Sequence, residues 1–346
     1  MDKIFNETDF ISNKIANTVK GNTFFSYPTG LTGKLGFCIY LYTRNKLDAK
    51  IQYENLADEL IDVIYSGINE FLPPDIENGL TGIGLGIRYL IKEHFIEGDI
   101  NELLEKIDIS VFKTIYFPKD GLVPDNRLKA ELLYYCGVRY EDREKGASGE
   151  CILKKLIFNI LNSCTSISDD FLEEPDSFSL SFRLPFFLYS LGTVAACEPF
   201  RHKVKTIMDE MTNKVVSLLP VLHSHRLYLL WGMCRLAKTF RIPAWEEHIR
   251  LLRNSININR IISNEIQGED IFLKTGLTGI GYLLQDYNKM VDDTEKILYD
   301  PALFHERITT SVTWRKLQHD EQFLKTNMGL SGFCGAALLL LNNMKD

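Results

Sequence analysis

The pattern of apolar and polar positions predicts two kinds of helix along this chain. In the segment 51–66, Leu56, Leu60 and Ile64 fall on one face of a helix, while Asp58 and Asp62 fall on the opposite face. This spacing of three and four residues predicts an amphipathic helix at a surface. The segment 204–218 repeats the pattern.

The second kind of segment is apolar almost all round. Between residues 80 and 91 few positions are polar, and the apolar residues are Leu80, Ile83, Leu85, Ile87, Leu90 and Ile91. A helix that is apolar on every face is expected to be buried. Because no convincing period-2 run separates these segments, the pattern requires no strand.

A tetrapeptide opens several of the apolar segments. Gly-Leu-Thr-Gly occurs at 30–33, 79–82 and 276–279, and Gly-Leu-Ser-Gly occurs at 329–332. Arg-Leu stands at the corresponding places 127–128, 183–184 and 226–227. The first two copies start 49 residues apart and the last two start 53 apart. Seven periods of about 49 residues therefore cover the chain.

The repeat predicts an all-α fold in which seven outer amphipathic helices alternate with seven inner buried helices. Two arrangements are open, a closed (α/α)7 toroid and an open superhelix. The closed ring is favoured because the first and last copies are as glycine-rich as any other, with no polar capping repeat. Residues 1–346 then form one domain, although length alone suggests two.

The glycines of the tetrapeptide need a physical reason, since Gly in a helix costs about 0.5–1 kcal/mol relative to Ala. At the start of an inner helix, Gly allows neighbouring backbones to approach closely. It also leaves the first N–H groups, with their positive dipole end, uncovered by a side chain. Packing is the expected main role, and the mouth where the helix starts converge is the expected ligand site.

The repeated Gly-Leu-x-Gly motif at this spacing resembles the lanthionine synthetase C-like family over the whole chain. The resemblance implies an α/α toroid and a role in ribosomal peptide modification. The best-known members add a peptide cysteine thiol to a dehydrated Ser or Thr and hold zinc with two Cys and one His. The implied partners are a peptide substrate or other peptide-modification enzymes.

The chain departs from this family at the zinc ligands. Ser224 stands where the first Cys is expected, and Lys274 and Thr275 replace the Cys-His pair before Gly276. We therefore expect no zinc and no other cofactor. The seven cysteines show no C-x-x-C spacing. Four of them lie inside inner helices and are expected to be small core residues: Cys38, Cys136, Cys234 and Cys334.

Polar residues before each motif are expected to line the mouth. We predict proton transfer by His225, Asp125 and Lys274. The expected substrate-binding residues are Arg127, Arg183, Arg226, Glu77, Asn78, His223, Thr275 and Asn327. Two alternatives stay open, because Asn and Thr are common helix N-caps and the cations can pair with Glu77 and Asp125 instead of an anionic ligand.

The resemblance, taken together with these residues, implies two alternative functions. The first is a zinc-independent thioether cyclase that acts on a dehydrated peptide. The second is a non-catalytic partner that keeps the toroid and binds a peptide or another enzyme. A carbohydrate-active toroid is a weaker alternative, because it needs two carboxylates facing one cavity and the mouth segments supply few aromatic residues.

Composition limits the partners and the cellular location that we expect. The formal charge of −7 argues against nucleic acid as a partner. No apolar run reaches the 18 residues of a membrane span, and the N-terminus lacks the apolar core of a signal peptide. Seven cysteines without a pairing pattern suit a reducing compartment, so a cytoplasmic location is expected.

Overall fold

A computed structural model describes residues 2–20, 26–48, 51–69, 71–117, 124–143, 149–164, 171–266 and 270–343. Within these ranges the chain forms 17 α-helices and short 3-10 and π segments, and it contains no strand. The expected all-α class is therefore confirmed. None of the helices in these ranges has both the length and the apolarity that crossing a bilayer requires.

The chain divides into two compact units. Unit 1 consists of Met1–Ile100, Gly268–Gly281 and Asp300–Asp346, and unit 2 consists of Asn101–Gln267 and Tyr282–Tyr299. All four glycine-rich motifs fall in unit 1, and all three Arg-Leu copies fall in unit 2. The single ring of seven repeats stays a prediction.

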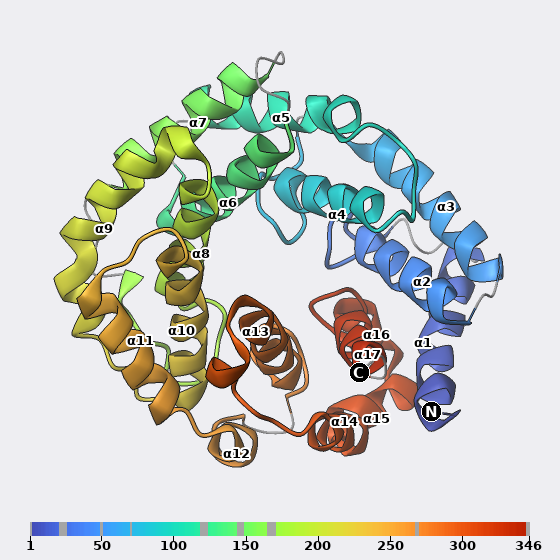
Figure 1. Ribbon diagram of the computed structural model, residues 1–346. Coiled ribbons are helices and arrows are strands. Elements are labelled where there is room, and N and C mark those ends of the chain that lie inside the picture. Colours follow the sequence, from blue (N-terminus) through green and yellow to red (C-terminus); the bar gives the residue numbers. More distant parts are fainter. Residues whose placement is uncertain are drawn as a thin grey trace. The chain divides into compact units, whose positions relative to one another are not determined.

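Unit 1 brings the two ends of the chain together. Its helix α17 packs against α1 and α2, and α2 packs against α3 and α4 (Figure 1). The bounds of its helices are α1 (Asp2–Lys20), α2 (Lys34–Asp48), α3 (Ile51–Gly67), α4 (Leu80–Lys92), α14 (Pro301–Thr310), α15 (Val312–His319), α16 (Glu321–Asn327) and α17 (Phe333–Asn342). Helix α13 (Leu277–Met290) begins in unit 1 and ends in unit 2.

Unit 2 has two layers of helices. In Figure 1, α5, α7, α9 and α11 lie on one side of the row α6, α8 and α10, whose neighbouring members pack together. The bounds are α5 (Ile100–Tyr116), α6 (Asn126–Asp142), α7 (Glu150–Ser163), α8 (Arg183–Ala195), α9 (Arg201–Val216), α10 (His223–Ala237), α11 (Pro243–Ser255) and α12 (Ile258–Arg260). The π segment Ile261–Glu265 follows α12.

The predicted helix patterns agree with the observed burial. On α3, Leu56, Leu60 and Ile64 are buried while Asp58 and Asp62 are exposed. On α9 the apolar stripe is buried as expected. On α4 the expected burial on every face is only partly correct, because Leu85 and Ile91 are half-buried and Tyr89 is 40% exposed. The cysteines predicted for the core are buried, namely Cys38, Cys136, Cys234 and Cys334.

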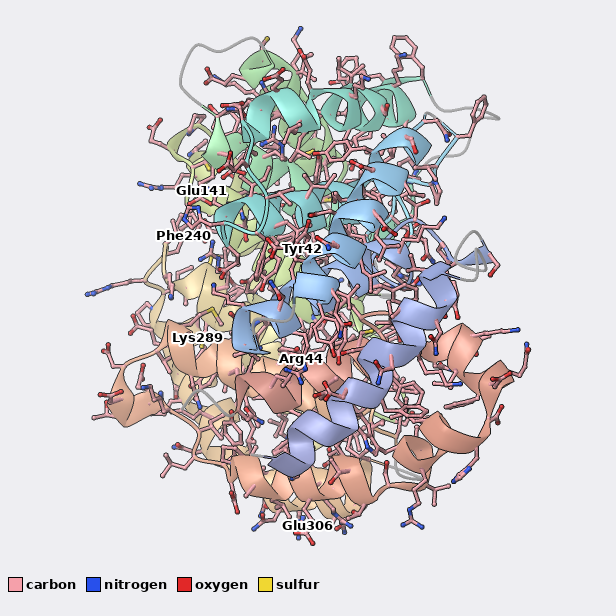
Figure 2. All side chains as sticks on the ribbon, turned by 90° about the vertical axis from the view of Figure 1, so that its right-hand side faces the viewer. Tyr42, Arg44, Glu141, Phe240, Lys289 and Glu306 are labelled. Atoms are coloured by element: carbon pink, nitrogen blue, oxygen red, sulfur yellow. The ribbon has the colours of Figure 1, made fainter. Side chains whose placement is uncertain are left out.

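Buried arginines join helices within each unit. In unit 1 the side chain of Arg44 on α2 is completely buried and donates to Asp9 of α1 at 2.7 Å (Figure 2). In unit 2, Arg139 of α6 is also completely buried and donates to Asp108 of α5 at 2.9 Å. Arg143 donates to the same carboxylate at 2.8 Å.

The glycine motifs touch one another through their backbones. The N–H of Thr32 donates to the carbonyl of Glu77 at 3.2 Å, and the N–H of Leu330 donates to the carbonyl of Leu31 at 3.0 Å. A Cβ added to Gly30 would lie 2.5 Å from the Cα of Asn78. Neighbouring copies therefore pack at backbone distance, which is the role expected for these glycines.

The first N–H groups of the inner helices are bonded to the loop that precedes them. Leu80 donates to the carbonyl of Pro73 at 2.7 Å, and Leu277 donates to that of Asp270 at 3.1 Å. Lys34 makes the same kind of bond at the start of α2, to a carbonyl six residues earlier. Because these N–H groups already donate to backbone carbonyls, they are not available to bind an anion, as unbonded N–H groups at a helix start would be.

Candidate functional site

Two of the predicted mouth residues pair with each other in unit 1. The Nζ atom of Lys274 lies 2.6 Å from Oε2 of Glu77, across 197 residues of sequence. The sequence left open whether Lys274 pairs with a carboxylate or binds an anionic ligand, and the structure shows the pair. Both side chains are partly exposed, so the pair contributes at most about 1 kcal/mol to stability.

Three further predicted residues of unit 1 bond to nearby protein groups. Asn78 accepts a hydrogen bond from the hydroxyl of Thr32. The hydroxyl of Thr275 donates to Asp270. The amide of Asn327 donates to the carbonyl of Phe323 at 2.8 Å, at the end of α16. These contacts hold the loops before the inner helices.

The expected helix caps are only partly correct. Asp125 is the N-cap of α6, and its carboxylate accepts from the N–H of Leu128 at 2.8 Å. The caps of α4 and α17 are Gly79 and Gly332, with no side-chain bond. The capping interpretation is therefore wrong for Asn78, which precedes α4, and for Asn327, which precedes α17.

The predicted arginines lie in unit 2. Arg127 is exposed and donates to Glu131 at 2.8 Å, one turn along α6. Arg183 is the first residue of α8 and is partly exposed. Arg226 donates to the carbonyl of Pro220 at 2.7 Å and to that of Ser255 at 3.2 Å. Arg226 therefore links α10 to the loop that precedes it and to the end of α11.

His225 is enclosed by protein groups. Its side chain is completely buried, and its Nε2 atom accepts from the N–H of Ser179 at 3.1 Å. Its Nδ1 atom therefore carries the proton and donates to Glu174 at 3.0 Å. Burial lowers the pKa of His225, although the hydrogen bond to Glu174 opposes this shift. Both ring nitrogens are thus committed to internal bonds.

Two carboxylates that sequence reasoning missed hold the start of α10. Glu174 accepts from the N–H groups of residues 221–222, at 2.9 and 3.1 Å. Glu265 accepts from those of residues 223–224, at 2.7 and 2.9 Å. His223 adds a bond from its Nδ1 atom to the carbonyl of Ser255 at 2.8 Å. Carboxylates are favoured at this positive end of a helix.

The residues at the positions where the resemblance implies zinc ligands do not fit a zinc ion. Ser224 offers a hydroxyl, the ammonium group of Lys274 is bound to Glu77, and the hydroxyl of Thr275 is bound to Asp270. Zinc prefers thiolate, imidazole and carboxylate ligands. Among the residues that the structure describes, no three His, Cys, Asp or Glu side chains come together as a metal site.

A row of aromatic side chains crosses α6, α8 and α10 in unit 2. This aromatic row consists of Phe186, Tyr134, Tyr189, Trp231 and Tyr228, in order of contact. Successive ring centroids lie 5.7, 5.9, 3.9 and 5.7 Å apart. The rings of Tyr189 and Trp231 are stacked nearly parallel, at 7°.

The aromatic row is open to solvent along part of its length. Phe186, Tyr134 and Tyr189 are partly exposed, whereas Trp231 is 9% exposed. The adjacent Tyr135 is completely buried and donates to Asp108 of α5 at 2.7 Å. The row therefore lies on a different face of α6 from the one that packs on α5.

Two charged groups border the aromatic row. Oδ2 of Asp286 on α13 accepts from the indole N–H of Trp231 at 2.7 Å and from the hydroxyl of Tyr189 at 3.5 Å. The guanidinium carbon of Arg235 lies 5.6 Å from the centre of the Tyr189 ring. Burial, and secondarily the Asp286 charge, raise the pKa of Tyr189, so its hydroxyl stays a donor.

The aromatic row was not predicted from the sequence, because it forms only where three helices pack side by side. A signal was present, since Phe186 and Tyr189 are three residues apart, as are Tyr228 and Trp231. Residues at this spacing share a helix face. The partner Asp286 is 55 residues from Trp231 and had no local signal.

A shallow groove of about 540 Å³ lies on the outer layer of unit 2. Tyr116 of α5 and Cys151, Lys155 and Phe158 of α7 line it. None of the catalytic or substrate-binding residues predicted from the sequence lines this groove.

No family model matches the chain, and a search of curated proteins finds no similar sequence.

Proposed function

We propose that this protein is a peptide-binding protein of the lanthionine-synthetase-C-like type, which keeps the repeat fold and does not catalyse thioether formation. Its seven helical repeats form a closed (α/α)7 toroid. Its ligand is a peptide or a peptide segment of another enzyme.

One observation supports the hypothesis that the protein is not a catalyst. Each side chain that was predicted to transfer protons bonds to another group of the protein. Lys274 pairs with Glu77, Asp125 caps α6, and His225 uses both ring nitrogens. A general base needs a nitrogen or oxygen within reach of the proton it removes. The buried His225 offers no nitrogen of that kind.

The toroid is supported by the contacts between the chain's ends. Helix α17 packs against α1 and α2, and the N–H of Leu330 in the last motif bonds to Leu31 in the first. In an open superhelix, terminal repeats have no such mutual contact. Peptide binding is supported by the aromatic row, because partly exposed aromatic rings are enriched where proteins bind peptides and proteins.

The test uses the full chain and two probes. The first is an immobilised-protein capture of peptides from a pool of random nonapeptides, with maltohexaose as a competing ligand. We expect captured peptides that bind with micromolar affinity and are not displaced by the sugar. Absence of any captured peptide, or displacement by the sugar, would overturn the proposal.

The second probe is a synthetic peptide with one dehydroalanine and one cysteine. Cyclisation adds the thiol across the C=C bond, so a C–S bond forms and a proton is delivered to the α-carbon. The mass stays constant, but the thiol no longer reacts with iodoacetamide. We expect no loss of reactive thiol above background. Turnover that disappears in His225→Gln would show a catalyst instead.

A further inference from the structure

We infer that Asp286 and the aromatic row form a recognition site for a basic side chain, Lys or Arg, of the bound peptide. This inference rests on the proposed peptide-binding function. It adds the chemical class of the peptide and the residue that selects it.

The Asp286 carboxylate is held in place on one side only. Both of its hydrogen bonds, from Trp231 and Tyr189, end on Oδ2. Within the described residues, Oδ1 receives no hydrogen bond, and it is not among the buried polar atoms without a partner. Oδ1 is therefore reached by solvent. A carboxylate accepts up to about four hydrogen bonds, so Asp286 has capacity for a further donor.

Over the ranges that the structure describes, the charge of Asp286 also has no ion-pair partner. Its two donors are neutral groups, and in the described part of the chain no Lys, Arg or His nitrogen lies within 4 Å of it. A partly buried carboxylate with neutral donors attracts a cation more strongly than a fully hydrated one does. A ligand ammonium or guanidinium would form a charge-assisted hydrogen bond with Oδ1.

The neighbouring rings suit the rest of a basic side chain. The methylene groups of Lys and Arg pack on apolar surface while the charged end stays near water. Tyr189 bonds to Asp286, and the partly exposed rings of Tyr134 and Phe186 continue the apolar surface from Tyr189. Trp231 is stacked on the Tyr189 ring and Arg235 lies over it, so a ligand cation would meet Arg235 there.

Two cations of the protein compete with the ligand. Arg235 lies by Tyr189, and Lys289 is exposed on α13, three residues after Asp286 (Figure 2). Neither is ion-paired with Asp286 in the structure as described. Both repel a second cation, so removing the charge of Arg235 is expected to strengthen binding of a basic peptide.

The experiment compares the composition of peptides captured from the random nonapeptide pool. We expect the wild-type protein to enrich Lys and Arg over norleucine at one position by about tenfold, the effect of one charge-assisted hydrogen bond. Asp286→Asn keeps the shape and removes the charge, and it should abolish this enrichment. The matched control Asp209→Asn changes an exposed carboxylate on α9 and should preserve it.

The outcomes separate the two proposals. Capture without enrichment of basic residues, or enrichment that survives Asp286→Asn, overturns this inference and leaves peptide binding intact. Absence of capture overturns both. If Asp286→Asn unfolds, Arg235→Gln decides instead, because it should tighten binding of captured Lys peptides several-fold. Unchanged or weaker binding in Arg235→Gln contradicts the inference.

Discussion

Gly82 has no room for a side chain. A Cβ at this position would overlap the carbonyl oxygen of Ile76, which belongs to the loop before α4. The same overlap recurs at Gly332, with the carbonyl of Asn327. At these positions glycine is required by the close approach of backbone, so the cost of glycine in a helix is offset by tight loop packing.

We predict that Gly82→Ala destabilises the protein by about 2 kcal/mol or more, because the backbone carbonyl cannot move away cheaply. Urea unfolding followed by circular dichroism measures the change. The matched control is Gly67→Ala at the end of α3, where the nearest atom to the added Cβ is 3.9 Å away. The control should stay within about 0.5 kcal/mol of wild type.

His225 makes stability depend on pH. Burial lowers its pKa in the folded state below the unfolded value of about 6.5. Between these two pKa values the unfolded chain binds more protons, so the free energy of unfolding falls as the pH drops from 7 through this window. His248, whose pKa burial also lowers, acts in the same direction.

We predict that His225→Gln reduces this loss of stability between pH 7.5 and pH 5. Urea unfolding at both pH values measures the difference. The exposed His202 on α9 provides the control, and His202→Gln should keep the pH dependence of the wild type. An equal loss of stability in the wild type and His225→Gln would show that His225 does not titrate in this way.

At the scale of helices, the two units start their inner helices by different means. In unit 1, loop carbonyls and glycines satisfy and surround the first N–H groups. In unit 2, the first turn of α10 contains Arg226, where unit 1 has the first glycine of the motif. The carboxylates of Glu174 and Glu265 accept hydrogen bonds from the backbone N–H groups at this helix start. Where this copy has arginine in place of glycine, carboxylates from two other segments of the chain bond to the N–H groups at the helix start.

Helices α5 and α6 are joined by a buried ion cluster. Asp108 is 3% exposed and accepts from Tyr135, Arg139 and Arg143. We predict that Asp108→Asn destabilises the protein by about 3–5 kcal/mol, because Arg143 would lose its carboxylate at 2.8 Å and Arg139 would keep only the more distant Asp142, at 3.6 Å. Thermal unfolding measures this.

The exposed pair Lys205 and Asp209 on α9 provides the comparison for this cluster. Asp209→Asn should cost less than about 1 kcal/mol, since water screens exposed pairs. Similar costs for Asp108→Asn and Asp209→Asn would show that the buried cluster contributes no more than a surface pair.

At the scale of the whole molecule, the ends of the chain share one unit. Helix α17 packs against α1 and α2, and the last glycine motif bonds to the first. Unit 1 is therefore built from the beginning and the end of the sequence. Its formation requires contacts between residues about 300 apart, which carries a large loop-closure entropy.

We predict that a circular permutant keeps the fold. Its original ends are joined by a Gly/Ser linker of about 20 residues, and new ends are opened at the exposed Gly98–Asp99 segment. Covalent joining of α17 to α1 preserves their contact, so the melting temperature should stay within about 5 °C of the parent. A permutant opened inside α2 is the control and should fail to fold. An unfolded Gly98 permutant would contradict the prediction.

The candidate site was predictable only where a local pattern marked it. The position of Asp125 at a helix start followed from motif spacing, whereas the pairing of Lys274 with a carboxylate was one of two alternatives that the sequence left open. Glu174, Glu265 and Asp286 did not, because each meets its partners across 41 to 97 residues without any repeat pattern. Side-chain contacts of this kind depend on how helices pack, and period and composition do not encode them.

The amino-acid sequence by itself determined the helical class, the helix pairs and the helix starts at the repeated motif. These features rest on periodicity and on glycine sterics, which act over a few residues. Tertiary structure alone decided that the first N–H groups are bonded, that His225 has no free nitrogen and that Asp286 borders an aromatic row. The physical reason is that burial and partner distance are set by packing between distant segments.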